Sequence, residues 1–199
     1  MNKYIRNTRI NAGNTVMSVM SDPRLDRVTA SLRAMFTEAR GYAAFDPVSD
    51  IGGITRFRAT GHPTDPDVHV FVYTGKLGVQ VLRSLVPVLT ECAHAMVVYS
   101  HTITSQARQE LQRLATGRVI ETFNLYALQF NLMAHVCVAD HCALAAPAIR
   151  ALGLVSEQLP DLLRSDPVAR WHHWLPGTVV RTTMSNPEGH PFYEYRKVV

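Results

Sequence analysis

Strand and helix patterns alternate along the middle of the chain, and this alternation limits the possible fold more than any other feature. Residues 92–100 (CAHAMVVYS) form an unbroken apolar run that is typical of a buried strand. The residues after it have helical spacing, and Thr104 is placed to cap that helix. Two strands and one helix are predicted before it, at Ile54–Ala59, Val68–Tyr73 and residues 76–90. This order of elements predicts an α/β layer.

The segments on either side of this layer suggest a second, smaller unit. A helix capped at Ser21-Asp22-Pro23 is predicted to end at Gly41, and residues 119–130 favour extended pieces over one helix. After Asn131 the pattern contains a short helix and a β-hairpin, at Ala145–Leu152, Thr178–Thr183 and Pro191–Val198. We therefore predict a flexible lead-in over residues 1–20, an α/β unit over 21–130 and a small α+β unit over 131–199.

Two X-Pro dipeptides interrupt a leucine-rich stretch inside the second unit. Pro160 and Pro167 fix their own φ angles and force the residue before each of them out of the α region. Each proline is expected to open a short new element, with Ser165 or Asp166 as the N-cap of a helix that begins at Pro167. Arg170 lies four residues after Asp166 and can pair with it. The stretch is predicted to be a rigid corner.

Bulk composition places the chain among globular proteins. Apolar residues make up 47% of it and charged residues 18%, which argues against a disordered chain or a coiled coil. No apolar run approaches the length of a transmembrane helix, and the first residues contain no apolar signal-peptide region. The three cysteines are an odd number, which suggests free thiols in a reducing compartment. We expect a soluble intracellular protein.

Positive charge is concentrated near the start of the chain. Residues 1–40 contain seven basic and three acidic side chains, which accounts for the whole net charge of +4. A basic section of this kind can be the electrostatic footprint of a nucleic-acid partner. A solvated helix face is the simpler explanation, and we favour it. The charge alone does not decide between them.

Motifs of the common enzyme classes are absent from the sequence, which has no P-loop, GxGxxG, HExxH or GxSxG. The one cluster with metal-ligand or nucleophile chemistry is His135, Cys137, His141 and Cys142, with Cys92 elsewhere. Its spacing does not match known zinc fingers. A small zinc or thiol enzyme is therefore kept only as the alternative, and we predict no catalytic residue, metal or cofactor. Aromatic and histidine side chains at 171–174 favour core packing or a subunit contact over base stacking.

The second half of the chain resembles a known family in several motifs that occur in the same order. These are Gln158-Leu159-Pro160, Asp166-Pro167-Val168-Ala169-Arg170, Pro176-Gly177-Thr178-Val179-Val180 and Tyr195-Arg196. They are similar to a domain of archaeal RNA polymerase that recurs at the carboxyl terminus of the fifth-largest subunit shared by eukaryotic nuclear RNA polymerases. The eukaryotic form also matches Arg40-Gly41-Tyr42, Val98-Tyr99 and Ile120-Glu121-Thr122-Phe123 further upstream. The resemblance covers roughly residues 24–199.

This resemblance implies a non-catalytic polymerase subunit in the nucleus. The family docks its carboxyl-terminal assembly domain on the largest subunit, and its amino-terminal jaw domain lies beside downstream double-stranded DNA. The implied interface residues are Leu159, Pro160, Leu162, Asp166, Pro167, Val168, Arg170 and Trp171. The implied DNA-proximal residues are His101, Thr102, Thr104, Ser105 and Arg108. No membrane or small-molecule substrate is implied.

One departure from the family concerns the tip of the last hairpin. The family usually has an arginine- and hydroxyl-rich run there, whereas residues 184–192 read MSNPEGHPF. We therefore predict a divergent copy dedicated to one polymerase, such as polymerase I in the nucleolus. A single copy that has drifted together with all its partners is the alternative.

Overall fold

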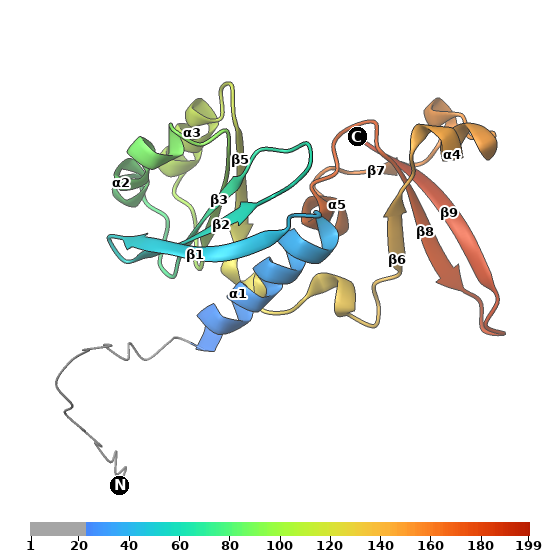
Figure 1. Ribbon diagram of the computed structural model, residues 1–199, viewed down its shortest axis with the longest axis horizontal. Coiled ribbons are helices and arrows are strands. Elements are labelled where there is room, and N and C mark those ends of the chain that lie inside the picture. Colours follow the sequence, from blue (N-terminus) through green and yellow to red (C-terminus); the bar gives the residue numbers. More distant parts are fainter. Residues whose placement is uncertain (1–22) are drawn as a thin grey trace, which may run out of the picture.

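Two β-sheets organise the part of the chain that the structure describes, which is residues 23–199 of a computed structural model (Figure 1). The first sheet has five strands in the order β1-β2-β3-β4-β5, and the second has four in the order β6-β8-β9-β7. The predicted lead-in over residues 1–20 lies outside the described residues. Among the residues described, no helix is both long and apolar enough to cross a membrane. The predicted mixture of α and β structure is confirmed.

The first sheet combines antiparallel and parallel pairing. The β1–β2 and β2–β3 pairs are antiparallel, whereas the β3–β4 and β4–β5 pairs are parallel. Helices α2 and α3 make the two crossovers that parallel strands require. The bounds are β1 Ala44–Ile51, β2 Ile54–Thr60, β3 Val68–Tyr73, α2 Val79–Leu89, β4 His94–Tyr99, α3 Ser105–Leu114 and β5 Val119–Asn124. Thr104 caps α3 as predicted, because its hydroxyl accepts a hydrogen bond of 3.2 Å from the Ala107 N–H.

Helix α1 (Pro23–Ala34) continues into a π-helical turn, η1 (Met35–Ala39). The Arg40 N–H donates to the Met35 carbonyl at 3.0 Å, five residues back, where an α-helix would bond four residues back. Gly41 then ends the helix at a φ of 77°, at the predicted stop. The wider turn changes the direction in which Arg40 points, compared with a continued α-helix. The Arg40 side chain is buried between the two sheets.

The second sheet has a small core of its own. Its strands are β6 Asp140–Ala143, β7 Asp161–Leu162, β8 Val179–Ser185 and β9 Pro191–Val198. The helical pieces after the first sheet are η2 Leu125–Leu128, which packs in the core of the first sheet, and η3 Leu132–Ala134, α4 Ala146–Ala151, η4 Ser156–Gln158 and α5 Pro167–His172. Only Leu162, Ala169, Val180 and Val198 form a buried apolar cluster here. Many apolar side chains of this unit therefore remain at its surface.

Both prolines of the predicted corner open a new element. Pro160 directly precedes the short strand β7, and Pro167 is the first residue of α5. The Asp166 carboxylate accepts hydrogen bonds from the N–H groups of Val168 at 2.8 Å and Ala169 at 3.4 Å. Asp166 is thus the N-cap, and the predicted corner is confirmed.

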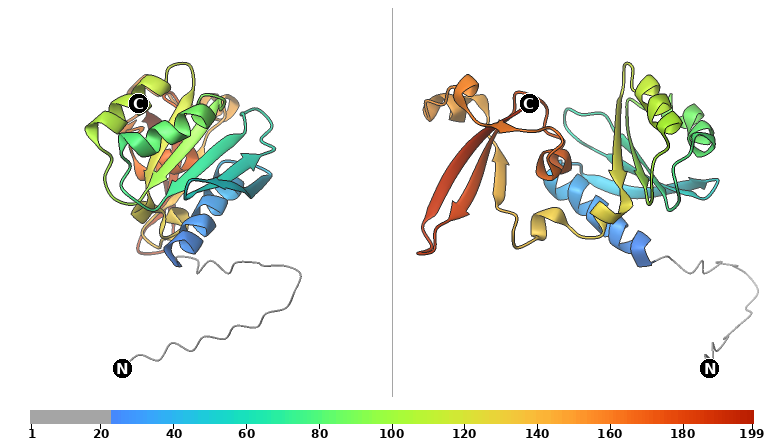
Figure 2. Two further views of the ribbon diagram at one scale, coloured as in Figure 1. Left: turned by 90° about the vertical axis from the view of Figure 1, so that its left-hand side faces the viewer. Right: turned by 180° about the vertical axis from the view of Figure 1, so that it is seen from behind.

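Apolar clusters fill both faces of the first sheet. One cluster packs beneath α1 and η1, and the other packs beneath α2 and α3. Trp171 belongs to the first of these clusters, although it lies on α5 in the second unit. The right-hand view in Figure 2 shows α5 lying between the two sheets. The two units are therefore joined through a shared apolar core.

Candidate functional site

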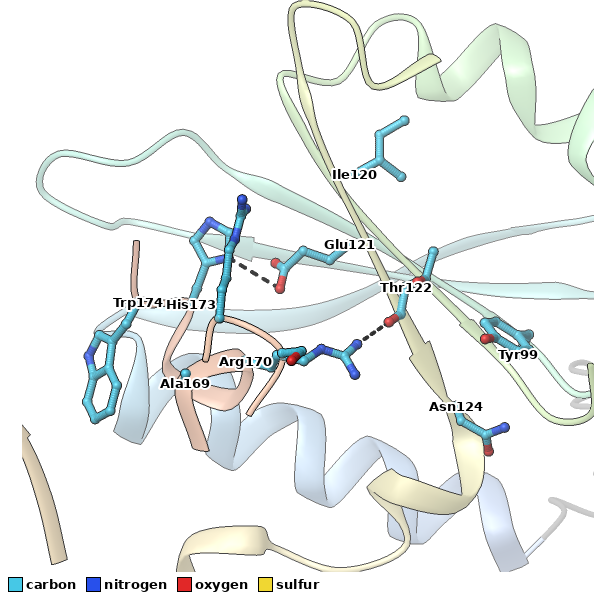
Figure 3. Close-up of a pocket in the computed structure, with 11 residues that line it drawn as sticks. Tyr99, Ile120, Glu121, Thr122, Asn124, Ala169, Arg170, His173 and Trp174 are labelled. Atoms are coloured by element: carbon cyan, nitrogen blue, oxygen red, sulfur yellow. Dashed lines mark hydrogen bonds and ion pairs between the residues drawn. The ribbon is translucent and has the colours of Figure 1, made fainter. Parts of the chain in front are cut away.

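A cluster of charged and polar side chains joins the two units, and we call it the junction: Arg40, His94, Glu121, Arg170 and His173. Arg40 follows η1, His94 and Glu121 lie on the neighbouring strands β4 and β5, and the other two lie on α5 or directly after it. Figure 3 shows the Glu121 side chain pointing from β5 toward His173, and the Arg170 side chain pointing from α5 toward Thr122. Segments that are far apart in sequence meet here.

The Arg40 side chain is 3% exposed and makes four hydrogen bonds. Its Nη1 and Nη2 donate to the two carboxylate oxygens of Glu121, at 2.7 and 2.9 Å. Its Nε and Nη2 donate to the carbonyl oxygens of Trp171 at 2.9 Å and Arg170 at 2.8 Å. A planar guanidinium is suited to this forked geometry. Arg40 therefore fastens β5 to α5.

Glu121 is held by three cationic or imidazole groups. Besides Arg40, His94 Nε2 lies 2.8 Å from Glu121 Oε1, and His173 Nδ1 lies 3.3 Å from Oε2. Burial alone would raise the pKa of the Glu121 carboxyl group. The charge of Arg40 and the hydrogen bonds from His173, His94 and Arg40 outweigh burial and hold this pKa well below its usual range. Glu121 is thus an ionised carboxylate at the centre of the junction.

His173 reaches the junction through an unusual backbone conformation. It ends α5 at a φ of 57°, and within residues 23–199 it is the one residue other than glycine that has a positive φ. A histidine in the left-handed region is uncommon, because its Cβ crowds the backbone there. This conformation places the imidazole beside Glu121. The surrounding contacts therefore hold a backbone that would otherwise be disfavoured.

The side chains of His94, Glu121 and His173 are also chemically able to ligate a metal, since one ligand atom from each lies within 4.8 Å of the others. Arg40, however, already bonds to both carboxylate oxygens, and its positive charge would repel a cation. The geometry favours a buried ion-pair clamp over a metal centre.

Comparisons with known proteins agree with the resemblance seen in the motifs. Residues 130–198 match the family model of the RNA polymerase Rpb5 C-terminal domain. DNA-directed RNA polymerase subunit 5-like protein 1 of Arabidopsis thaliana is 30% identical over 146 residues, which cover 69% of this chain and 69% of that protein. The chain belongs to the Rpb5 family.

Two other members of the Rpb5 family carry the name DNA-directed RNA polymerases I, II, and III subunit RPABC1. The protein from Caenorhabditis elegans is 26% identical over 147 residues, which cover 69% of this chain and 70% of that protein. The protein from Dictyostelium discoideum is 28% identical over 145 residues, which cover 69% of this chain and 74% of that protein. The similarity therefore extends well beyond the matched carboxyl-terminal domain.

Most of the interface residues implied by the Rpb5 resemblance lie around α5, but two of them are internal. Leu162 is 8% exposed and Trp171 is 2% exposed, so both pack inside this chain. The expectation that these two side chains form a docking surface directly is corrected. Leu159 and Val168 are half-buried, and Pro160 and Pro167 are exposed. Their contact with another subunit stays a prediction.

Arg170 also differs from the expectation. Instead of pairing with Asp166, it donates to the carbonyl oxygen of Thr122 on β5, as the dashed line in Figure 3 shows. Its guanidinium carbon lies 4.2 Å from the centre of the Phe123 ring. A cation over an aromatic face is attracted by the ring electrons. Arg170 therefore stabilises the junction between the two units.

The DNA-proximal residues implied by the Rpb5 resemblance lie together at one end of the first unit, on the loop after β4 and the first turns of α3. The side chains of His101, Thr102, Ser105 and Arg108 are exposed, and Thr104 is half-buried because it caps the helix. The Thr102 carbonyl accepts a hydrogen bond of 3.1 Å from the Leu77 N–H, which fixes the loop to the segment before α2. Whether these residues contact DNA stays a prediction.

The histidine and cysteine cluster considered from the sequence is not assembled. His135 Nδ1 accepts a hydrogen bond from the Cys137 N–H, and His141 Nδ1 lies 2.6 Å from the Ala139 carbonyl oxygen. Within residues 23–199, these four side chains form no group with metal-ligand spacing. The alternative of a zinc or thiol enzyme therefore has no support.

The junction itself was missed from the sequence. Arg40 and Glu121 occur in short family motifs, but neither motif indicates a partner for them. His94 carried no signal, since a histidine at the start of an apolar strand has no pattern of its own. A charged residue beside apolar residues in a strand, such as Glu121 after Val119 and Ile120, was the one available hint, because such a group is rarely buried without a partner.

Proposed function

We propose that this chain is a non-catalytic subunit of a nuclear DNA-dependent RNA polymerase. Its 131–199 unit is an assembly domain that docks on the largest subunit, and its 21–130 unit is a jaw beside downstream DNA. Membership of the Rpb5 family carries the proposal, because its relatives are named as RNA polymerase subunits. The role is one of binding and positioning, with the chemistry performed elsewhere in the complex.

The surface of the 131–199 unit supports a role in assembly. Eight of the eleven exposed large apolar side chains among the described residues belong to it: Val136, Leu152, Val155, Leu163, Leu175, Phe192, Tyr193 and Val199. A cavity of about 320 Å³ on the same unit is lined in part by Leu162, Asp166 and Val168. Exposed apolar area of this kind is typical of a surface that becomes buried against a protein partner.

Affinity purification tests the assembly role. The tagged chain should recover the largest polymerase subunit in an amount equal to its own, as judged by mass spectrometry. Val168→Glu places a charge in the cavity and should reduce this recovery. Val119→Glu is the matched control, because Val119 is an exposed valine on the first unit. Recovery of no polymerase subunit, or equal loss with both variants, would contradict the proposal, provided that both variants melt like the parent protein.

The DNA contact is a separate part of the proposal. The amino terminus of α3 offers free N–H groups that suit phosphate, and the exposed Arg108 lies one turn further on. Ser105→Glu combined with Arg108→Glu should shorten the lifetime of elongation complexes at moderate salt without changing promoter choice. Gln109→Glu combined with Arg113→Glu changes the charge equally, further along the same helix. An unchanged salt dependence in the first variant would count against the contact.

A further inference from the structure

Strand β5 is an edge strand, and one of its sides has no neighbouring strand. The Val119 N–H donates to the Ala93 carbonyl oxygen at 3.0 Å, and this bond fixes which residues face β4. Residues 119, 121 and 123 bond to β4, because alternate residues do so in a parallel pair. Ile120, Thr122 and Asn124 therefore turn their backbone groups outward. We call this row of outward groups the β5 edge.

The β5 edge is only partly covered. Arg170 donates to the Thr122 carbonyl oxygen from the side of α5. Within residues 23–199, no protein group bonds to the Thr122 N–H or to the N–H and carbonyl of Ile120. Unpaired edge groups of this kind are a template for a further strand. Three backbone groups in a row are thus available to another chain.

A cavity lies on each side of the β5 edge. The larger, of about 580 Å³, is lined from the α5 side by Arg164, Arg170 and His173 and is the one drawn in Figure 3. The smaller, of about 320 Å³, is lined from the α3 side by residues that include Ile103, Arg108 and Leu111. Tyr99, Ile120 and Thr122 line both cavities. Because successive side chains of a strand point to opposite faces, an added strand would fill the two cavities alternately.

The charges around the β5 edge indicate which side chains fit there. On the α5 side, Arg164 is exposed and has no ion-pair partner among residues 23–199. Arg108 is also exposed and without such a partner, but it lines the cavity on the α3 side. Glu121 is the one acidic residue in either lining, and Arg40 neutralises it. Acidic side chains therefore suit the α5 side. Ile103 and Leu111 offer apolar area on the α3 side, where apolar side chains fit.

We propose that the β5 edge binds an extended peptide segment of a protein partner, as a sixth strand in which acidic and apolar residues alternate. Main-chain hydrogen bonds would give such a strand its affinity, and the two cavities would select its side chains. Arg170 keeps its bond to Thr122 and uses its remaining N–H groups for an acidic side chain. This binding site shares Arg108 with the proposed DNA contact and Arg170 with the residues implied at the subunit interface, but its peptide binding does not depend on the polymerase assignment.

The direct test uses the full chain and a fluorescein-labelled heptapeptide of alternating valine and glutamate. Fluorescence anisotropy should show saturable binding, and the same peptide with lysine in place of glutamate should bind about tenfold more weakly or worse. Amide exchange measured by NMR should slow at Ile120 and Thr122 on saturation. It should not change at Val119, whose N–H is already bonded to Ala93. Peptide binding without protection of Ile120 and Thr122 would overturn the proposal.

A charge-reversal variant adds a second criterion. Arg164→Glu should weaken binding of the valine-glutamate peptide about tenfold, because it reverses the charge on the α5 side. Arg83→Glu is the matched control, since Arg83 is exposed on α2 and lines neither cavity. Equal effects of the two variants would reduce the interaction to general electrostatics and refute the site. Tighter binding of a DNA duplex of about 20 base pairs, lost in Arg164→Glu, would assign the β5 edge and its two cavities to nucleic acid instead.

Discussion

At the scale of single residues, one buried carboxylate decides how the two units are joined. Glu121 is bonded to Arg40, His94 and His173, which come from three different segments. Removing one member of a buried ion pair leaves an uncompensated charge, and that is more costly than the pair itself is stabilising. Variants that break the junction should therefore have large effects on stability.

Glu121→Ala should lower the free energy of unfolding by about 3–5 kcal/mol, because Arg40 then remains buried without its counter-charge. Urea denaturation followed by circular dichroism measures this difference. Glu110→Ala serves as a control, since Glu110 pairs with Arg113 on the exposed face of α3. Similar losses in the two variants would contradict the assigned role of Glu121.

The Glu121 carboxylate should also make stability depend on pH. Its pKa in the folded protein lies well below the value in an unfolded chain, which is about 4.3. Between these two values the unfolded state binds more protons, so the contribution is fully present above pH 5 and is lost as the pH falls toward the folded pKa. The free energy of unfolding of Glu121→Gln should therefore fall less steeply at acid pH than that of the parent protein. Urea denaturation at several pH values measures this. Parallel curves for the parent protein and this variant would be evidence against the linkage.

Sequence reasoning was more successful for local roles than for long-range ones. The caps at Thr104 and Asp166 follow from residues a few positions away, and both were predicted. The pairing of Arg170 was not, because a local partner in Asp166 was available and the actual acceptor lies 48 residues away in the sequence. Local rules apply to neighbours in the chain, whereas the junction depends on which segments the fold brings together.

At the scale of elements, the π-helical turn η1 controls where Arg40 points. A π-helical turn contains one residue more than the corresponding α-helical turn. Deleting Thr37, whose side chain hydrogen-bonds to the Arg33 carbonyl, should restore α-helical spacing and rotate Arg40 by about 100°. Thr37→Ala keeps the chain length and is the control.

The deletion of Thr37 should destabilise the protein far more than Thr37→Ala. It moves the Arg40 side chain away from Glu121, although neither of these two residues is substituted. Denaturation measurements on the two variants provide the comparison. A deletion variant as stable as Thr37→Ala would mean that η1 has no role in positioning Arg40.

Other elements show which patterns can be read from the sequence. The parallel strands β3 and β4 were predicted because both of their faces are buried and their sequences are apolar apart from one histidine in each. Strand β1 was not predicted, because it is an edge strand that contains Pro47 and mixes polar and apolar residues. The two-residue strand β7 exists through its pairing with β9, and no local pattern marks a strand that short.

At the scale of the whole molecule, the tip between β8 and β9 bears on which polymerase the chain serves. Asn186 organises the tip by accepting hydrogen bonds from the N–H groups of Glu188 and His190, and Phe192 and Tyr193 are exposed beside it. A neighbour shaped for arginine and hydroxyl side chains should reject this acidic and aromatic tip. We therefore expect immunoprecipitation of the tagged chain to recover the largest subunit of one nuclear polymerase. Comparable recovery of all three would show that the chain is shared.

The burial of Trp171 has a consequence for the time at which the first unit can finish folding. This side chain packs beneath α1 and η1 with residues that precede it by more than a hundred positions. During synthesis, the ribosome will have completed the five strands of the first sheet long before Trp171 emerges. Until then, the core of the nascent first unit lacks the Trp171 side chain. A chaperone that recognises exposed apolar surface would have its longest opportunity to bind during this interval.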